Sequence, residues 1–83
     1  MTQKNSGENK LLLTDMKERQ KGIIISILAG RTANKRLADL GLTPETEIKV
    51  LKNAMWCPVE IEVRGSKLAI GRGLASKILI KLK

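Results

Sequence analysis

The sequence predicts a mainly β fold, a small barrel of about five strands with one short helix after the first strand. Short segments alternate apolar and polar residues and are bounded by glycine, proline and asparagine, which is typical of strands and turns. One segment instead carries its apolar residues at helical spacing. Short strands joined by tight turns favour a barrel, because closing a sheet removes its exposed edges.

The first expected strand spans residues 22–28, a largely β-branched run bounded by glycine. A helix follows over residues 31–40, where apolar residues recur at i, i+4 and i+7. Thr32 is expected to cap the start of this helix. Gly41 is expected to end it with a positive φ, and Leu42 to fold back onto its last turn.

The remaining strands follow from alternation between turn signals. They are expected over residues 47–52, 59–64, 67–70 and 77–82. Gly65 and Ser66 are expected to form a two-residue type II′ hairpin turn, and residues 71–75 a tight turn. The expected core combines inward-facing strand positions with two helix-docking leucines: Ile23, Ile25, Ile48, Val50, Val59, Ile61, Val63, Ile70, Ile78 and Ile80, with Leu37 and Leu40.

Length and charge bound the class of protein. The 83 residues suit one domain, and we divide them into a disordered polar tail over residues 1–10 and a folded domain over residues 11–83. The formal charge of +8 favours acidic partners, or serves solubility alone. The single cysteine, Cys57, fits a reducing compartment. Without a signal-peptide pattern or an apolar run of about 20 residues, we expect a cytoplasmic protein with no membrane insertion.

Catalytic and metal-binding patterns are missing from the sequence. There is no histidine, and Cys57 alone cannot form a structural zinc or iron–sulfur site. We therefore expect no enzyme activity, no cofactor and no resident metal, and anaerobic calorimetry with ferrous ion should show no tight binding. The segment Gly71-Arg72-Gly73 lacks the Gly-Lys-Ser/Thr that follows in a phosphate-binding loop, so we interpret it as a turn.

Two stretches carry a family likeness, namely residues 36–51 (RLADLGLTPETEIKVL) and 58–80 (PVEIEVRGSKLAIGRGLASKILI). Their order and spacing resemble the ferrous iron transport protein A (FeoA) family over residues 12–82. The resemblance implies an SH3-like barrel and a cytoplasmic accessory role in ferrous iron uptake. The implied partner is a membrane transporter that carries a G-protein domain. The same domain type occurs as the C-terminal module of metal-dependent repressors. A stand-alone regulatory domain similar to that module is therefore the alternative.

One position of the turn after the helix departs from the family pattern. Glu45 follows Pro44, where family members usually have glycine. Glycine in that position permits a positive φ, which glutamate adopts only at a cost. We therefore expect a type I turn over residues 43–46.

Partner-binding residues are expected in two places. In the loop over residues 54–57, Met55 and Trp56 stand where family members have small residues, and tryptophan is the residue type most enriched at binding hot spots. The alternative is that Trp56 closes one end of the barrel as core. The second place is the short helix, whose basic residues could face an acidic partner or form a solvated surface: Arg31, Lys35 and Arg36.

A small nucleic-acid-binding barrel is the alternative function that the net charge supports. Barrels that bind single strands usually stack bases on several aromatic side chains. Trp56 is the only aromatic residue in this chain, which disfavours that alternative. Duplex binding needs no stacking, so the alternative stays open.

Overall fold

The computed structural model describes residues 10–83. The expected polar tail therefore falls on residues 1–9, outside the described part of the chain, while Lys10 belongs to the first strand. The elements, in chain order, are β1 (Lys10–Leu12), the 3₁₀ helix η1 (Leu13–Asp15), β2 (Lys21–Ile27), α1 (Gly30–Asp39), β3 (Glu47–Lys52), β4 (Val59–Val63), β5 (Ser66–Ile70), α2 (Arg72–Ala75) and β6 (Ile78–Leu82).

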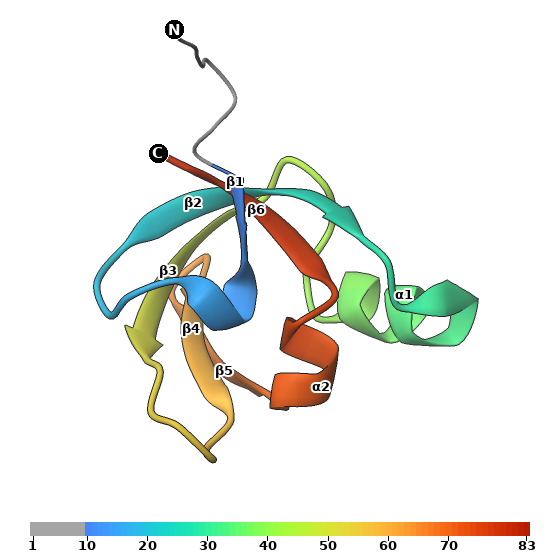
Figure 1. Ribbon diagram of the computed structural model, residues 1–83. Coiled ribbons are helices and arrows are strands. Elements are labelled where there is room, and N and C mark those ends of the chain that lie inside the picture. Colours follow the sequence, from blue (N-terminus) through green and yellow to red (C-terminus); the bar gives the residue numbers. More distant parts are fainter. Residues whose placement is uncertain (1–9) are drawn as a thin grey trace, which may run out of the picture.

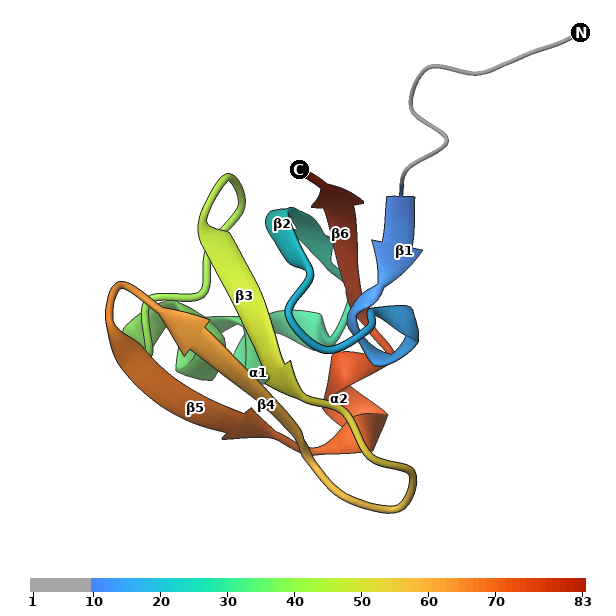
Figure 2. The same ribbon diagram turned by 90° about the vertical axis from the view of Figure 1, so that its left-hand side faces the viewer.

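The six strands form one antiparallel sheet in the order β1-β6-β2-β3-β4-β5. The sheet curls around a single core, with β1 and β5 at its two edges, and α1 lies outside the barrel beside the end of β2 (Figures 1 and 2). The predicted fold class is confirmed, including the helix after the first predicted strand, which is β2. The strand β1 and the one-turn helix α2 were not predicted, since three- and four-residue elements carry too little periodicity to be recognised.

Within residues 10–83, the core is built from fourteen buried apolar side chains, most of them on the inner faces of the strands. They are Leu13, Met16, Ile24, Leu37, Leu42, Ile48, Val50, Val59, Ile61, Val63, Ile70, Ala75, Ile78 and Ile80. The expected core positions in β3, β4, β5 and β6 are confirmed. Leu13 and Met16, which precede β2, were missed because no alternation marks them.

The predicted phase of β2 is wrong. Ile24 is buried, whereas Ile23 and Ile25 are only partly buried. The register with β6 shifts between Ile24 and Ser26, a bulge that brings Ile27 against the core. Gly22 also faces inward, where a Cβ would overlap Cγ2 of Ile80. The run is apolar almost throughout, so the sequence alone does not set its phase.

The helix α1 ends as predicted, in a Schellman motif. Gly41 has a φ of 90°, its N–H donates to the carbonyl oxygen of Ala38 at 2.9 Å, and the N–H of Leu42 donates to that of Leu37 at 2.8 Å. Leu37 and Leu42 are both buried, whereas Leu40 is 52% exposed and does not dock the helix. Leu42 takes that role because the reversal at Gly41 turns the chain back onto the barrel.

The start of α1 differs from the prediction. The residue before its first turn is Ala29, and Thr32 lies within the helix instead of capping it. The side-chain Nδ2 of Asn34 donates to the carbonyl oxygen of Ile27 at 3.2 Å, which ties the first turns of α1 to the end of β2.

We expect Gly41→Val to lower the free energy of unfolding by about 1 kcal/mol or more, because a β-branched residue at a φ of 90° is strained even though the space around Gly41 is open. Urea denaturation measures the loss. Gly71→Val is the matched control, since Gly71 is also open but has a φ of −56°. Equal losses in the two variants would contradict the assignment of Gly41.

Two turns differ from their predicted types. Glu45 has a φ of 74°, so the turn over residues 43–46 is not type I. The N–H of Glu45 donates to the carbonyl oxygen of Ile24 at 2.6 Å, and pairing with β2 imposes this conformation on a glutamate. The β4–β5 hairpin turns at Arg64 and Gly65, with φ values of 52° and 83°, which is type I′ and lies one residue earlier than predicted.

Candidate functional site

The loop between β3 and β4, residues 53–58, projects from one end of the barrel and carries its most exposed apolar side chains (Figures 1 and 2). Trp56 is 89% exposed and Met55 is 73% exposed. The alternative in which Trp56 closes the barrel as core is therefore wrong. A large aromatic side chain left in solvent beside a methionine is typical of a surface that another molecule covers.

The tip of this loop is a tight turn. The N–H of Cys57 donates to the carbonyl oxygen of Ala54 at 3.1 Å, which closes a four-residue turn with Trp56 in its third position. Trp56 has a φ of 71°, a conformation that favours glycine. A non-glycine residue held there costs about 1–3 kcal/mol and persists only where the surroundings fix it.

Arg72 supplies part of that support. Its Nη1 donates to Oδ1 of Asn53 at 2.8 Å and to the carbonyl oxygens of Ala54 at 3.0 Å and Cys57 at 3.1 Å. Hydrogen bonds from a charged donor are stronger than those between neutral groups. One guanidinium therefore connects the first residue of the loop with the residue that follows Trp56.

Asn53 extends this network to the segment after β1. Its Nδ2 donates to the carbonyl oxygens of Thr14 at 3.0 Å and Met16 at 2.6 Å. Its backbone N–H donates to Oε2 of Glu18 at 3.3 Å. Three segments, the β3–β4 loop, α2 and residues 14–18, therefore meet at one asparagine. We call Arg72 and Asn53, with these hydrogen bonds, the clasp.

Sequence reasoning did not find the clasp. Arg72 lies in residues 71–75, which were predicted to be a tight turn, and the structure makes them the helix α2. Asn53 and Arg72 are 19 residues apart, and no spacing connects them. The glycines on both sides of Arg72 are the only local sign that its position is unusual.

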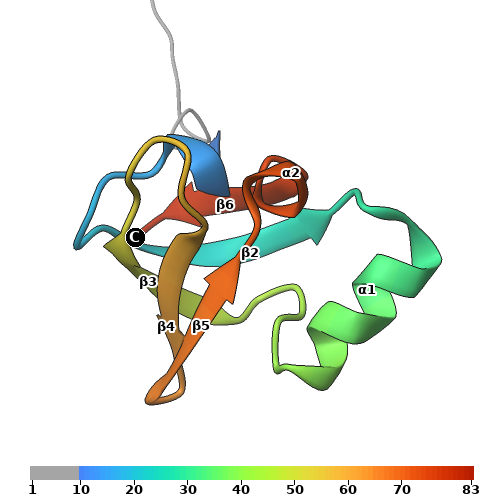
Figure 3. The ribbon, with the colours of Figure 1, turned by 90° about the horizontal axis from the view of Figure 1, so that it is seen from below.

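The basic residues of α1 form a second surface. Arg31, Lys35 and Arg36 are all exposed, and Leu28 and Leu40, just outside the two ends of the helix, are 72% and 52% exposed. Figures 1 and 3 place α1 and the β3–β4 loop on opposite sides of the molecule. The structure thus divides the predicted partner-binding residues into two separate groups.

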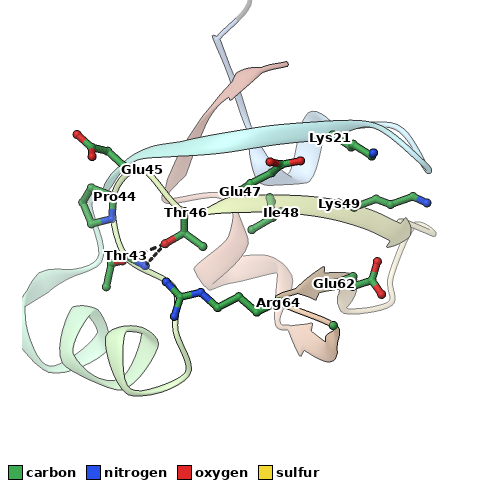
Figure 4. A pocket seen from close by; sticks show the side chains of 11 residues that line it. Lys21, Thr43, Pro44, Glu45, Thr46, Glu47, Ile48, Lys49, Glu62 and Arg64 are labelled. Atoms are coloured by element: carbon green, nitrogen blue, oxygen red, sulfur yellow. Dashed lines mark hydrogen bonds between the residues drawn. The ribbon is translucent and has the colours of Figure 1, made fainter.

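A hollow of about 680 Å³ lies elsewhere, between the turn over residues 43–46, the outer side of β3 and the β4–β5 turn (Figure 4). Its charged lining residues are three bases and three acids: Lys21, Lys49, Arg64, Glu45, Glu47 and Glu62. The hydroxyl groups of Thr43 and Thr46 share a hydrogen bond of 3.0 Å in its wall. Its mixed charge points to no ligand class, and it contains none of the predicted partner-binding residues.

An ion pair beside this hollow joins the C-terminal residue, Lys83, to the first residue of β3, Glu47. Nζ of Lys83 donates to Oε1 of Glu47 at 2.8 Å, and this hydrogen bond, with the charge of Lys83, lowers the pKa of Glu47. Among residues 10–83, no three His, Cys, Asp or Glu side chains are grouped closely enough to hold a metal ion. Within the same residues, neither helix has the length and apolar character needed to cross a bilayer.

A curled antiparallel sheet with a short helix between β2 and β3 defines an SH3-like domain. The chain belongs to the FeoA domain family, whose model matches residues 11–82. A Methanocaldococcus jannaschii protein described as an Fe(2+) transport protein A is 42% identical over 65 residues, 78% of each chain.

Solved structures agree with this assignment. A crystal structure described as an iron uptake regulatory protein (FeoA) has a TM-score of 0.85 and 36% identity, and covers 89% of this chain and 99% of that chain. A manganese-dependent transcriptional repressor has a TM-score of 0.81 at 14% identity, and the match covers 89% of this chain and 42% of the repressor. The likeness to the repressor shows the fold alone.

Proposed function

We propose that this chain is a cytoplasmic accessory protein of ferrous iron uptake that binds the G-protein-containing part of a ferrous iron transporter. Membership of the FeoA domain family and the likeness to an Fe(2+) transport protein A support a role in ferrous iron uptake. The exposed Trp56, held at the tip of a braced loop, supports a binding role and carries the proposal. In this role the protein acts by contact and catalyses no reaction.

The β3–β4 loop is the primary contact in this proposal. Trp56 and Met55 would enter an apolar pocket of the transporter, where a desolvated indole contributes more than most interface residues. The basic side chains of α1 would meet an acidic segment of the same assembly on the other side of the barrel. Such peripheral charges raise the rate of association more than the final affinity.

The test is a pull-down from native membranes with the tagged protein as bait, followed by identification of what it retains. We expect to find the ferrous iron transporter among the retained proteins. An unrelated small domain of equal net charge is the control, because a charge of +8 attracts acidic proteins without specificity. Recovery of the transporter at the level of that control would contradict the proposal.

A regulatory or nucleic-acid-binding domain is the second candidate, which the charge of +8 and the fold shared with a repressor favour. A titration with mixed duplex and single-stranded nucleic acid at several salt concentrations separates the two. We expect weak binding that disappears as salt rises, since it would rest on phosphate contacts alone. Binding at micromolar affinity or better in physiological salt would favour the second candidate.

A further inference from the structure

The β3–β4 loop is braced at both ends by one side chain. Nη1 of Arg72 reaches Oδ1 of Asn53 at 2.8 Å and the carbonyl oxygen of Cys57 at 3.1 Å. These two residues flank the exposed pair, Met55 and Trp56. The loop therefore cannot change the separation of its two ends without breaking a hydrogen bond to a charged group.

Arg72 is itself fixed in place. It is the first residue of α2, and its carbonyl oxygen accepts a hydrogen bond from the N–H of Ser76 at 3.0 Å. Ala75, at the other end of this short helix, is fully buried in the core. The backbone of Arg72 is thus anchored to the packed barrel, and its guanidinium reaches from there to the β3–β4 loop.

The conformation that the clasp maintains is an unfavourable one for Trp56. A φ of 71° is left-handed backbone, which a free loop carrying tryptophan would leave. Such a conformation persists where neighbouring groups determine it. The neighbouring contacts are the turn's own hydrogen bond from Cys57 to Ala54 and the hydrogen bonds from Arg72 to the carbonyl oxygens of the same two residues, one on each side of the exposed pair.

We propose that Arg72 is a positioning residue for partner binding: its guanidinium holds the β3–β4 loop in the conformation that presents Trp56. This inference rests on the proposed function of the loop as the partner contact. Without Arg72 the loop samples several conformations, and the apparent affinity falls in proportion to the fraction that stays competent. Binding then carries an ordering cost that the clasp removes in advance.

The first measurement uses the isolated protein and needs no partner. In Arg72→Met, which keeps an unbranched apolar stem but loses every donor, amide hydrogen exchange over residues 54–57 should speed up and the fluorescence anisotropy of Trp56 should fall. Arg72→Lys, which keeps a charged donor, should show a smaller change in both. Arg64→Met is the matched control, since Arg64 is an exposed arginine of the β4–β5 turn outside the clasp.

The second measurement compares binding kinetics with the cytoplasmic part of the transporter. Arg72→Met should weaken binding about tenfold, through slower association, with dissociation little changed because Trp56 still makes its contacts once bound. Arg72→Lys should recover part of the loss. If Arg72 had a purely structural role, Arg72→Met would lower the stability of the domain. It would not selectively slow association while leaving dissociation unchanged.

The two measurements distinguish the positioning role of Arg72 from the proposed function of the β3–β4 loop as the partner contact. Unchanged exchange and anisotropy in Arg72→Met would overturn the positioning role, and so would a disordered loop that binds with unchanged affinity. Failure of the unmodified protein to bind the transporter would refute the proposed function, while the measurements on the isolated protein would still decide whether Arg72 holds the loop. If Arg72→Met does not fold, the same comparison of Arg72→Lys with the control decides it.

Discussion

Ile61→Ala is expected to lower the free energy of unfolding by about 2–5 kcal/mol. Ile61 is the middle residue of β4, opposite Val50 on β3 and Leu68 on β5, and it is 1% exposed. Removing its side-chain carbons leaves a cavity that the flanking strands cannot fill, because the pairing on both sides holds them apart. The total stability of a domain of this length is only about 4–12 kcal/mol, so the loss takes a large part of it.

Glu60→Ala is the matched control for this experiment. Glu60 is the preceding residue of the same strand and is exposed, so its truncation should change stability by less than about 0.5 kcal/mol. Chemical denaturation of both variants gives the comparison. A melting curve that Ile61→Ala leaves unchanged would show that β4 faces the other way.

Trp56→Ala is expected to weaken binding to the transporter by about 2 kcal/mol or more, close to 30-fold, while the domain folds normally. The indole is 89% exposed in the free protein, so its removal takes little from the core. Calorimetry or surface plasmon resonance measures the affinity, and denaturation measures the stability. Lys67→Ala, at an exposed position of β5, is the control for surface truncation.

Trp56→Gly makes the comparison sharper. Glycine accepts a φ of 71° without strain, so this variant should be as stable as the unmodified protein or more stable by about 1 kcal/mol, and should still lose binding. Because Trp56 is the only aromatic residue, its fluorescence reports the loop directly. Blue-shifted, quencher-protected emission from the isolated protein, or strong destabilisation of Trp56→Ala, would refute the contact role.

Strands that alternate apolar and polar residues could be predicted to within one residue at each end, and so could the faces that they bury. In β4, apolar residues face inward at every second position, and Val59, Ile61 and Val63 are all buried as expected. In β2 the sequence is apolar on both faces, so the pattern does not say which residues face the core. Gly22 faces inward, and any side chain at that position would overlap Ile80. That constraint belongs to the packed barrel and has no signal in the local sequence.

The backbone conformation after α1 could be predicted from a glycine, whereas the positive φ of two non-glycine residues could not. Gly41 adopts the positive φ that its place after the helix indicates. Glu45 and Trp56 adopt positive φ values against their own preference. Residues distant in sequence form hydrogen bonds at both places: Ile24 of β2 accepts from the N–H of Glu45, and Arg72 donates to the carbonyl groups on either side of Met55 and Trp56.

The candidate site was predictable in its exposed half only. Met55 and Trp56 could be named because tryptophan is enriched at binding hot spots, while the choice between an exposed and a core Trp56 came from the structure. Arg72 and Asn53 could not, because their roles arise from the folding of α2 against the β3–β4 loop. The basic residues of α1 were recognised as exposed, but their separation from the loop across the barrel is a property of the fold.

The measurement that tests the central claim most directly is photo-crosslinking in intact cells. A benzophenone amino acid is placed at position 56, and in separate variants at position 35 on α1 and position 67 on β5. The account predicts that position 56 captures the ferrous iron transporter and position 67 does not. Capture from position 67 or from position 35, with none from position 56, would contradict the assignment of the β3–β4 loop as the primary contact.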